Sequence, residues 1–439
     1  MKNKFFKIFI IILVILLILS ILGILIYLNI KSSANENENL SQTLPQKIFE
    51  SEKGKIDKYT LFGTHFNVNG NLKIHSNDIN QTNSKLCLII ENNITHEENI
   101  LDLKYTFDEI SINFYTSDKL NKGINLEELE IGDYKLYLQL NNLTTGLNTY
   151  YSLENISNYS DLEYYTITKN NSNNKIDIIF SNETLNISCN ECILPENVYD
   201  IVIDPGHGGT STGTIHFGYI ESEINYDVSV ALKESLEKLG LKVLLTRTSK
   251  EQTVNNYNDD GRAVIPNKVK SKLCLSIHNN SSPINPNSKG LEIYCPNFSD
   301  LTFGHSLADN IENIASSSYS PNTVGLVNNG VYVLKFDEKT IEECRQEAIT
   351  DGYEPYSITT ETNLFFMIRE VGGICTGAYI DGRDIKSGNN PYVNSNMVAE
   401  SYLLELGYVS NKEDIENVIN NKDKYVEAIT KSIKELYAF

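Results

Sequence analysis

Four side chains that could take part in catalysis lie far apart in the second half of the chain: His207, Glu221, His278 and Glu405. Two imidazoles and one carboxylate form a donor set that holds catalytic zinc and leaves a fourth position open for water. The first three residues match that set. Glu405 adds a carboxylate that could accept a proton from an activated water and pass it to a leaving amine. The residue types therefore indicate metal-assisted hydrolysis of an amide.

Three of these residues follow apolar runs that are typical of buried strands. Residues 199–203 lead to His207, residues 273–277 lead to His278, and residues 401–404 lead to Glu405. A further apolar run at 242–245 fits the same pattern. The carboxyl ends of parallel strands share one edge of a sheet, which is where ligands bind. We therefore expect the three side chains to converge at one sheet edge.

Glycines flank His207 on both sides in the segment Asp204-Pro205-Gly206-His207-Gly208-Gly209. A turn with few side chains lets a ligand approach the imidazole closely. We expect Asp204 to orient the second ring nitrogen of His207. Taken alone, this segment is equally compatible with a surface turn that happens to contain a histidine.

Glu221 is expected in the first turn of a helix that ends at Gly240, because apolar residues with helical spacing share one face: Ile224, Val228, Leu232, Leu236 and Leu239. An acidic residue in a first turn also interacts favourably with the helix dipole, so capping alone would account for it. Glu223 is the nearest rival ligand, and spacing alone does not decide between the two.

The motifs at residues 204–209, 221–225, 276–280 and 404–411 together resemble those of the type 3 N-acetylmuramoyl-L-alanine amidases, and the resemblance covers residues 198–439. It implies that His207, Glu221 and His278 bind Zn²⁺ and that Glu405 is catalytic. It also implies that the substrate is the amide between N-acetylmuramic acid and L-alanine in peptidoglycan. Glu221 is favoured over Glu223 because the family has Asn four residues after its ligand, as Asn225 follows Glu221.

Two other functions remain open. One is a zinc carboxypeptidase or endopeptidase that acts on stem peptides with the same metal set. The other is a non-catalytic wall-binding protein, which the presence of all four key residues disfavours. Residues 335–398 are longer than the family's usual passage into its last strand, and Arg369 and Arg383 within them could meet substrate carboxylates or form structural ion pairs. His216 occupies no motif position and is expected to be a loop histidine.

Residues 8–30 are almost wholly apolar, long enough as a helix to span the roughly 30 Å hydrocarbon core of a membrane. We expect a cytoplasmic stub and transmembrane anchor over residues 1–31. Lys2, Lys4 and Lys7 precede the apolar run, which predicts a cytoplasmic N-terminus and a single-pass protein whose catalytic domain faces the cell wall. A long signal peptide cleaved near residues 32–34 is the alternative.

The remaining chain divides by composition into three parts. Residues 32–58 are polar and aperiodic and predict a flexible linker. Residues 59–197 alternate polar and apolar side chains between Asn- and Gly-containing breaks, which predicts a β-sandwich domain, immunoglobulin-like in its pattern. Residues 198–439 predict an α/β catalytic domain with a mostly parallel sheet flanked by helices.

Composition limits the partners of the chain. The formal net charge is −20, with 37 Lys and Arg against 57 Asp and Glu, so no nucleic acid is expected to bind. Seven widely spaced cysteines do not form the pattern of a disulfide framework. Only Cys189 and Cys192 lie close enough in sequence to suggest a small disulfide loop or half of a zinc knuckle. The sequence leaves the oligomeric state undetermined.

Overall fold

The computed structural model describes residues 47–74, 79–155, 160–180, 184–256, 260–352, 355, 357–373 and 397–439. Residues Glu50–Phe439 form one compact unit. Within the part of the chain that the structure describes, no helix has the length and the apolar character needed to cross a membrane. The predicted membrane span at residues 8–30 lies outside the described residues.

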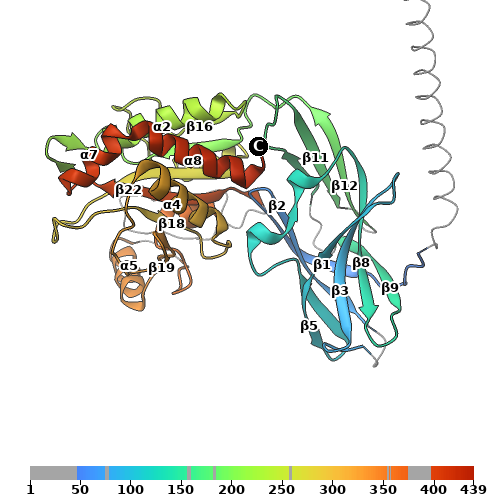
Figure 1. Ribbon diagram of the computed structural model, residues 1–439. Helices are drawn as coiled ribbons and strands as arrows, with labels where there is room; N and C mark the ends of the chain where they lie inside the picture. Colours follow the sequence, from blue (N-terminus) through green and yellow to red (C-terminus); the bar gives the residue numbers. More distant parts are fainter. Residues whose placement is uncertain are drawn as a thin grey trace, which may run out of the picture. The chain divides into compact units, whose positions relative to one another are not determined.

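The first part of this unit is built from strands (Figure 1). Strands β10, β11, β12, β8, β3 and β4 pair antiparallel, as do β1, β2, β6 and β5. Strand β9 pairs antiparallel with β8 and, over three residues, in parallel with β1, so the two sets join in one continuous sheet. Alternate residues of both sets point inward, and together they bury one hydrophobic core.

The strands of this part range from two residues in β7 to eleven residues in β8. Their bounds are β1 Gly54–Phe62, β2 His65–Lys73, β3 Ser84–Asn92, β4 Glu98–Asp102, β5 Lys104–Asp108, β6 Ser111–Tyr115, β7 Ile124–Asn125, β8 Gly132–Asn142, β9 Asn148–Asn155, β10 Leu162–Tyr165, β11 Asn173–Phe180 and β12 Leu185–Cys192, with 3-10 helices at Leu120–Lys122 and Leu126–Glu128.

The second part is an α/β fold around a mixed sheet with the order β16-β13-β17-β22-β18-β20-β19. The first four strands in this order are parallel to one another. Strand β18 runs antiparallel to β22, and β19 runs antiparallel to β20. The parallel strands are buried on both faces, which explains their nearly continuous apolar sequence.

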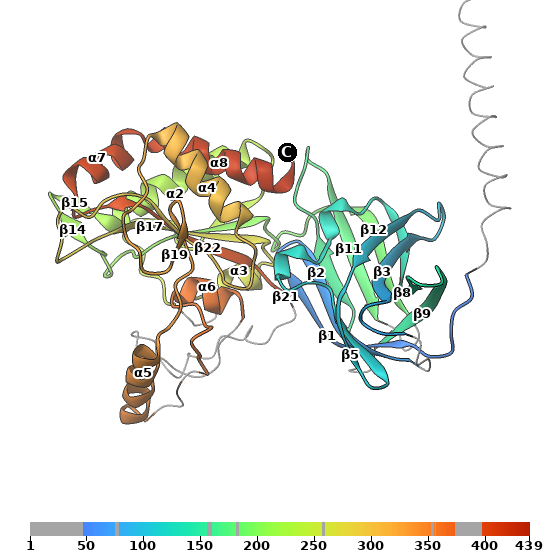
Figure 2. The ribbon, with the colours of Figure 1, turned by 60° about the horizontal axis from the view of Figure 1, so that its bottom comes forward.

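Helices cover both faces of this sheet (Figures 1 and 2). Helices α2, α4 and α8 pack on one face and enclose the larger core. Helices α3 and α6 lie on the other face and enclose two smaller cores. The apolar residues of α2 named from the sequence are buried against the sheet as expected, apart from Leu239, which lies just beyond the helix and is partly buried.

The elements of the α/β part follow each other in chain order. Their bounds are β13 Ile201–Pro205, β14 Ile215–His216, β15 Tyr219–Ile220, α2 Glu221–Glu237, β16 Val243–Leu245, α3 Ile265–Lys268, β17 Leu273–Asn280, β18 Glu292–Tyr294, α4 Thr302–Ala315, β19 Leu326–Asn328, β20 Val331–Tyr332, α5 Glu338–Thr350, α6 Phe366–Val371, β21 Met397–Val398, β22 Glu400–Tyr408, α7 Lys412–Asn420 and α8 Lys422–Tyr437.

Two features differ from the expectation for the β-rich part. Strand β1 begins at Gly54, inside the range expected to be linker, because Ile56 packs into the core although its flanking residues are polar. The strands also do not form two separate antiparallel sheets, since β1 pairs in parallel with both β9 and β21. Strand β21 directly precedes β22, so a segment near the end of the chain extends the first sheet.

Candidate functional site

His207 follows β13 in a turn that its neighbouring glycines make possible. Its own φ of 59° lies in the left-handed region, where non-glycine residues are uncommon. A Cβ atom on Gly206 would lie 2.3 Å from Nε2 of His278, so only glycine allows the two histidines to come this close. The two imidazole rings are 5.1 Å apart between centroids. Gly206 therefore serves the approach of the second histidine.

Glu221 is the first residue of α2 and is 4% exposed. One carboxylate oxygen, Oε2, accepts a hydrogen bond of 3.0 Å from the backbone N–H of Thr214. The backbone N–H of Glu221 donates in turn to the carbonyl of Thr214, also over 3.0 Å. Asn225, one helical turn later, donates to Oε1 over 3.4 Å. These contacts hold the side chain toward the sheet edge, with Oε1 facing the histidines.

The structure brings His207, Glu221 and His278 together, as the sequence predicted. Oε1 of Glu221 lies 3.3 Å from Nε2 of His207 and 3.1 Å from Nδ1 of His278. One donor atom from each residue lies within 4.8 Å of the other two, and no other such group of three is assembled among the described residues. Glu223, the rival ligand, is exposed on the opposite side of the helix.

The donor set fits a zinc ion in both chemistry and spacing. Zinc accepts imidazole nitrogen and carboxylate oxygen at about 2.0–2.1 Å in tetrahedral geometry, which places two ligand atoms about 3.3 Å apart. The two distances from Glu221 to the histidines match that separation. With three protein donors, a tetrahedral site keeps one position open, as catalytic zinc sites do.

The carboxyl group of Glu221 is surrounded in a way that favours its ionised form. Burial alone would raise its pKa, but hydrogen bonds with His207 and His278, together with their charges, hold the pKa well below its usual value. A carboxylate that keeps its charge at neutral pH is ready to bind a cation.

Glu405 lies inside β22, which continues to Tyr408 instead of ending before the glutamate as expected. In the register of the sheet, Glu405 is opposite His278 on one side and opposite Glu292 on the other. Its side chain is 9% exposed, and Oε2 has no hydrogen-bond partner within the described structure. Burial is the main cause that raises the pKa of Glu405 well above its usual value, and repulsion from Glu221 and Glu292 raises it further. This carboxylate therefore has a strong affinity for a proton.

Glu292 is a residue of the site that the sequence analysis missed. It is fully buried on β18 and accepts hydrogen bonds from the hydroxyl groups of Tyr294 and Tyr408 over 2.5 Å and 2.7 Å. A third bond of 3.0 Å comes from the side-chain amide of Asn280. The sequence signal that could have revealed Glu292 is its position as the single acidic residue within the apolar run 291–294, because acidic residues are rare in buried strands.

The role expected for Asp204 is wrong. His207 Nδ1 contacts the hydroxyl group of Ser211 at 3.2 Å, and Asp204 points elsewhere. Asp204 is fully buried and accepts hydrogen bonds from Thr246, Ser276 and Arg262 over 2.6, 2.7 and 3.1 Å. Burial would raise its pKa, but the charge of Arg262 and the two hydroxyl donors lower it overall. Asp204 thus connects three segments beneath the site.

The other residues singled out from the sequence lie away from the metal donors. His216 is exposed on the two-residue strand β14. Arg369 is buried, and its Nε lies 3.4 Å from a carboxylate oxygen of Glu370. Of the two roles considered for Arg369, this contact fits the structural ion pair. Residues 374–396 of the 335–398 stretch, which include Arg383, lie outside the described residues. Cys189 and Cys192 are free thiols on β12, so the disulfide suggested by their spacing is not formed.

Comparison with known proteins agrees with these motifs. A family described as N-acetylmuramoyl-L-alanine amidase matches residues 201–435, more than half of the chain. N-acetylmuramoyl-L-alanine amidase LytC of Bacillus subtilis is 26% identical over 138 residues, which are 31% of this chain and 27% of LytC. The chain therefore spans about a quarter of the length of that curated relative.

Solved structures of similar proteins include N-acetylmuramoyl-L-alanine amidase AmiC2 of Nostoc punctiforme, with 20% identity, 55% of this chain and 98% of that chain covered, and a TM-score of 0.36. The catalytic domain of CwlV, an amidase from Bacillus (Paenibacillus) polymyxa var. colistinus, has 17% identity, 55% and 99% coverage, and a TM-score of 0.36. On the extent of the family match, this chain belongs to the N-acetylmuramoyl-L-alanine amidase family.

Proposed function

We propose that this protein is a zinc-dependent N-acetylmuramoyl-L-alanine amidase that hydrolyses the amide bond between N-acetylmuramic acid and L-alanine in peptidoglycan. The observation that carries the proposal is the convergence of one donor atom each from His207, Glu221 and His278 within 4.8 Å, beside the buried carboxylate of Glu405. Membership of the amidase family supports the choice of bond.

The residues divide the work of amide hydrolysis between them. His207, Glu221 and His278 would hold the ion. When bound, Zn²⁺ supplies a Lewis acid that polarises the amide carbonyl and lowers the pKa of water. Glu405 accepts the proton of the attacking water at its free Oε2, because burial and two neighbouring carboxylates give it a high proton affinity. The same group then returns the proton to the nitrogen of L-alanine as the C–N bond breaks.

We propose further that the protein is anchored in the cell membrane by residues 8–30, with the α/β part on the outer side facing the wall. The apolar run and the three lysines before it support this orientation. Protease added to intact spheroplasts should digest the α/β part and leave a short membrane-bound fragment that begins at the original N-terminus. A protein that resists the protease until the membrane is opened would contradict the orientation.

Digestion of purified peptidoglycan tests the proposed reaction. The full-length chain loaded with zinc should release stem peptides with a free L-alanine amino terminus and leave glycan strands that carry free lactyl carboxylates, both identified by mass spectrometry. A Glu405→Gln variant, which keeps the size of the side chain but cannot take up a proton, is the matched control and should release neither product. New peptide termini together with intact lactyl amides would instead identify a peptidase and refute the amidase assignment.

A further inference from the structure

One buried side chain, that of Asn225, contacts all three segments that carry the proposed metal donors. Asn225 lies on α2, one helical turn after Glu221, and is fully buried. Besides its contact with Glu221, its Nδ2 group donates a hydrogen bond of 3.2 Å to the backbone carbonyl of Gly206, which directly precedes His207. The two N–H bonds of one amide can serve two acceptors at once. Asn225 therefore ties the start of α2 to the turn that presents His207.

The third contact leads to the second histidine. Oδ1 of Asn225 accepts a hydrogen bond of 2.9 Å from Nδ2 of Asn279, which directly follows His278 on β17. Asn279 is also buried, and its backbone N–H donates to Oε1 of Glu221 over 3.5 Å. These bonds hold β17 beside α2 at the point where the strand presents His278. The amide of Asn225 thus reaches one donor and the immediate neighbours of the other two.

Hydrogen bonds behind the ligands of a metal site fix the orientation of those ligands, and their loss typically lowers metal affinity by about 10- to 100-fold. The amide of Asn279 depends on Asn225, because its Oδ1 has no hydrogen-bond partner within the described structure. We infer that Asn225 is a positioning residue of the metal centre, which holds His207, Glu221 and His278 in the arrangement that a single ion requires. The inference rests on the zinc ion of the proposed function.

A second buried side chain holds the same turn, which allows variants of Asn225 to be tested. Arg247 is fully buried, and its guanidinium group donates to the backbone carbonyls of Pro205, Gly206 and Ser222 over 3.0, 3.4 and 2.5 Å. These bonds keep the turn after β13 next to α2 when the amide of Asn225 is removed. None of the hydrogen bonds that Arg247 makes in the described structure reaches β17. We therefore expect a variant of Asn225 to fold while its metal donors lose their common alignment.

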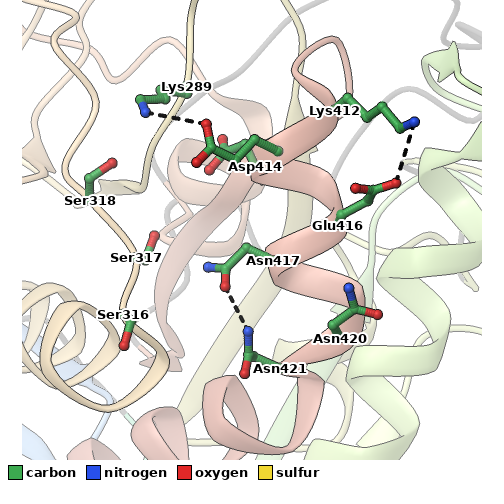
Figure 3. A pocket seen from close by; sticks show the side chains of 11 residues that line it. Lys289, Ser316, Ser317, Ser318, Lys412, Asp414, Glu416, Asn417, Asn420 and Asn421 are labelled. Carbon is green, nitrogen blue, oxygen red and sulfur yellow. Dashed lines mark hydrogen bonds and ion pairs between the residues drawn. The ribbon is translucent and has the colours of Figure 1, made fainter.

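Two other asparagines provide matched controls. Asn417 on α7 forms the same kind of amide pair, since its Oδ1 accepts a hydrogen bond of 2.7 Å from Nδ2 of Asn421 (Figure 3). Its own Nδ2 donates to the hydroxyl group of Tyr425 over 3.1 Å. Asn310 on α4 matches the burial of Asn225 more closely, and its Nδ2 donates to the hydroxyl group of Ser432 on α8 over 2.9 Å. No side-chain hydrogen bond of Asn417 or Asn310 in the described structure reaches a segment that carries a metal donor.

The test measures metal binding, so it does not depend on turnover of peptidoglycan. The zinc Kd of the full-length protein is measured by competition with a chelator of known affinity. Asn225→Leu keeps a side chain of similar size but removes its hydrogen bonds, and should raise the Kd by about 10- to 100-fold. Asn225→Ala, which is smaller and favours the helix, is the second variant and should show the same loss. Asn417→Leu and Asn310→Leu should leave the Kd unchanged.

Co²⁺ binds the same nitrogen and oxygen ligands as zinc, and its visible absorption reports how those ligands are arranged. The Co²⁺ spectra of both Asn225 variants should differ from that of the wild type, whereas the spectra of the two controls should superimpose on it. An unchanged Kd and spectrum in both Asn225 variants, equal weakening in the controls, or loss of folding in both Asn225 variants by circular dichroism overturns the inference even if the protein hydrolyses muramoyl amides. Weakened zinc binding confined to the Asn225 variants supports the inference even if no hydrolysis is found, in which case the proposed reaction alone fails.

Discussion

Replacing Glu292 by glutamine should shift the pH dependence of catalysis without disturbing the metal donors. Glu292 lies opposite Glu405 across neighbouring antiparallel strands, and its negative charge is one of the causes that raise the pKa of Glu405. Glutamine has the same shape and keeps one carbonyl oxygen for the tyrosine hydroxyl groups. The substitution therefore removes a charge while it largely preserves the packing.

The expected shift follows from the sheet geometry. Side chains opposite one another on antiparallel strands have Cβ atoms about 5 Å apart, which puts the two carboxylates roughly 6 Å apart. At an effective dielectric constant of about 20, that repulsion amounts to about 3 kcal/mol, or about two pKa units. The three hydrogen bonds to Glu292 and a bound cation reduce this figure, and we expect a shift of about one unit.

The assay is the pH profile of kcat/KM for hydrolysis of a soluble muropeptide by the zinc-loaded full-length chain. Glu405 must be deprotonated to accept a proton, so activity should rise with pH through its pKa. In Glu292→Gln the acid limb should move to lower pH, because the pKa of Glu405 falls when the neighbouring charge is removed. Tyr294→Phe removes one hydrogen bond to Glu292 but keeps the charge, and should not produce this downward shift. An acid limb that stays in place or moves to higher pH in Glu292→Gln would refute the coupling between the two glutamates.

Three further predictions concern stability. Phe217 has a φ of 54° at the turn between β14 and β15, a left-handed conformation that asparagine adopts more readily than phenylalanine does, so Phe217→Asn should stabilise the fold by about 1 kcal/mol. A melting temperature that does not rise, or one that rises equally in Phe217→Ala, would contradict this. Burial raises the pKa of Glu400 from 4.5 to about 7, so the folded state binds the proton of this group more tightly than the unfolded state does. The free energy of unfolding, measured by urea titration, should therefore fall by up to about 3 kcal/mol between pH 4.5 and pH 7. In Glu400→Gln this pH dependence should be flatter. Asp204→Asn leaves the buried Arg262 without its counter-charge and should cost about 3 kcal/mol in urea unfolding, whereas a loss below about 1 kcal/mol would count against the connecting role of Asp204.

The sequence predicted that His207, Glu221 and His278 come together, because each lies at one end of a strongly patterned element, while their role as zinc donors stays a prediction. His207 and His278 follow apolar runs that form β13 and β17, and Glu221 begins the helix whose apolar face was evident from its spacing. Parallel strands place their carboxyl ends at one edge, so the approach of His207 and His278 followed from strand type alone, whereas Glu221 joins them from the start of α2. The position of Glu405 within β22 was less accurate, because an apolar run does not reveal that a strand continues past a glutamate.

Other features depend on contacts that local sequence does not record. Asp204 precedes His207 by three residues, yet its partners Thr246, Ser276 and Arg262 come from three other segments. Glu292 belongs to the site only because β18 pairs antiparallel with β22, a pairing that an expectation of a mostly parallel sheet does not suggest. The parallel pairings of β1 were missed for the same reason, since strand partners far apart in sequence leave no periodic signal.

The metal content of four variants tests the central claim most directly. Full-length wild-type protein, exposed to excess zinc and then dialysed, should retain one zinc ion per chain by mass spectrometry of the metal. His207→Ala, Glu221→Ala and His278→Ala should each lose it, while Glu405→Gln keeps it and loses hydrolysis. Folding of each variant is checked by circular dichroism. Stoichiometric zinc retained in any two of the three donor variants would show that the ion binds elsewhere and contradict the account.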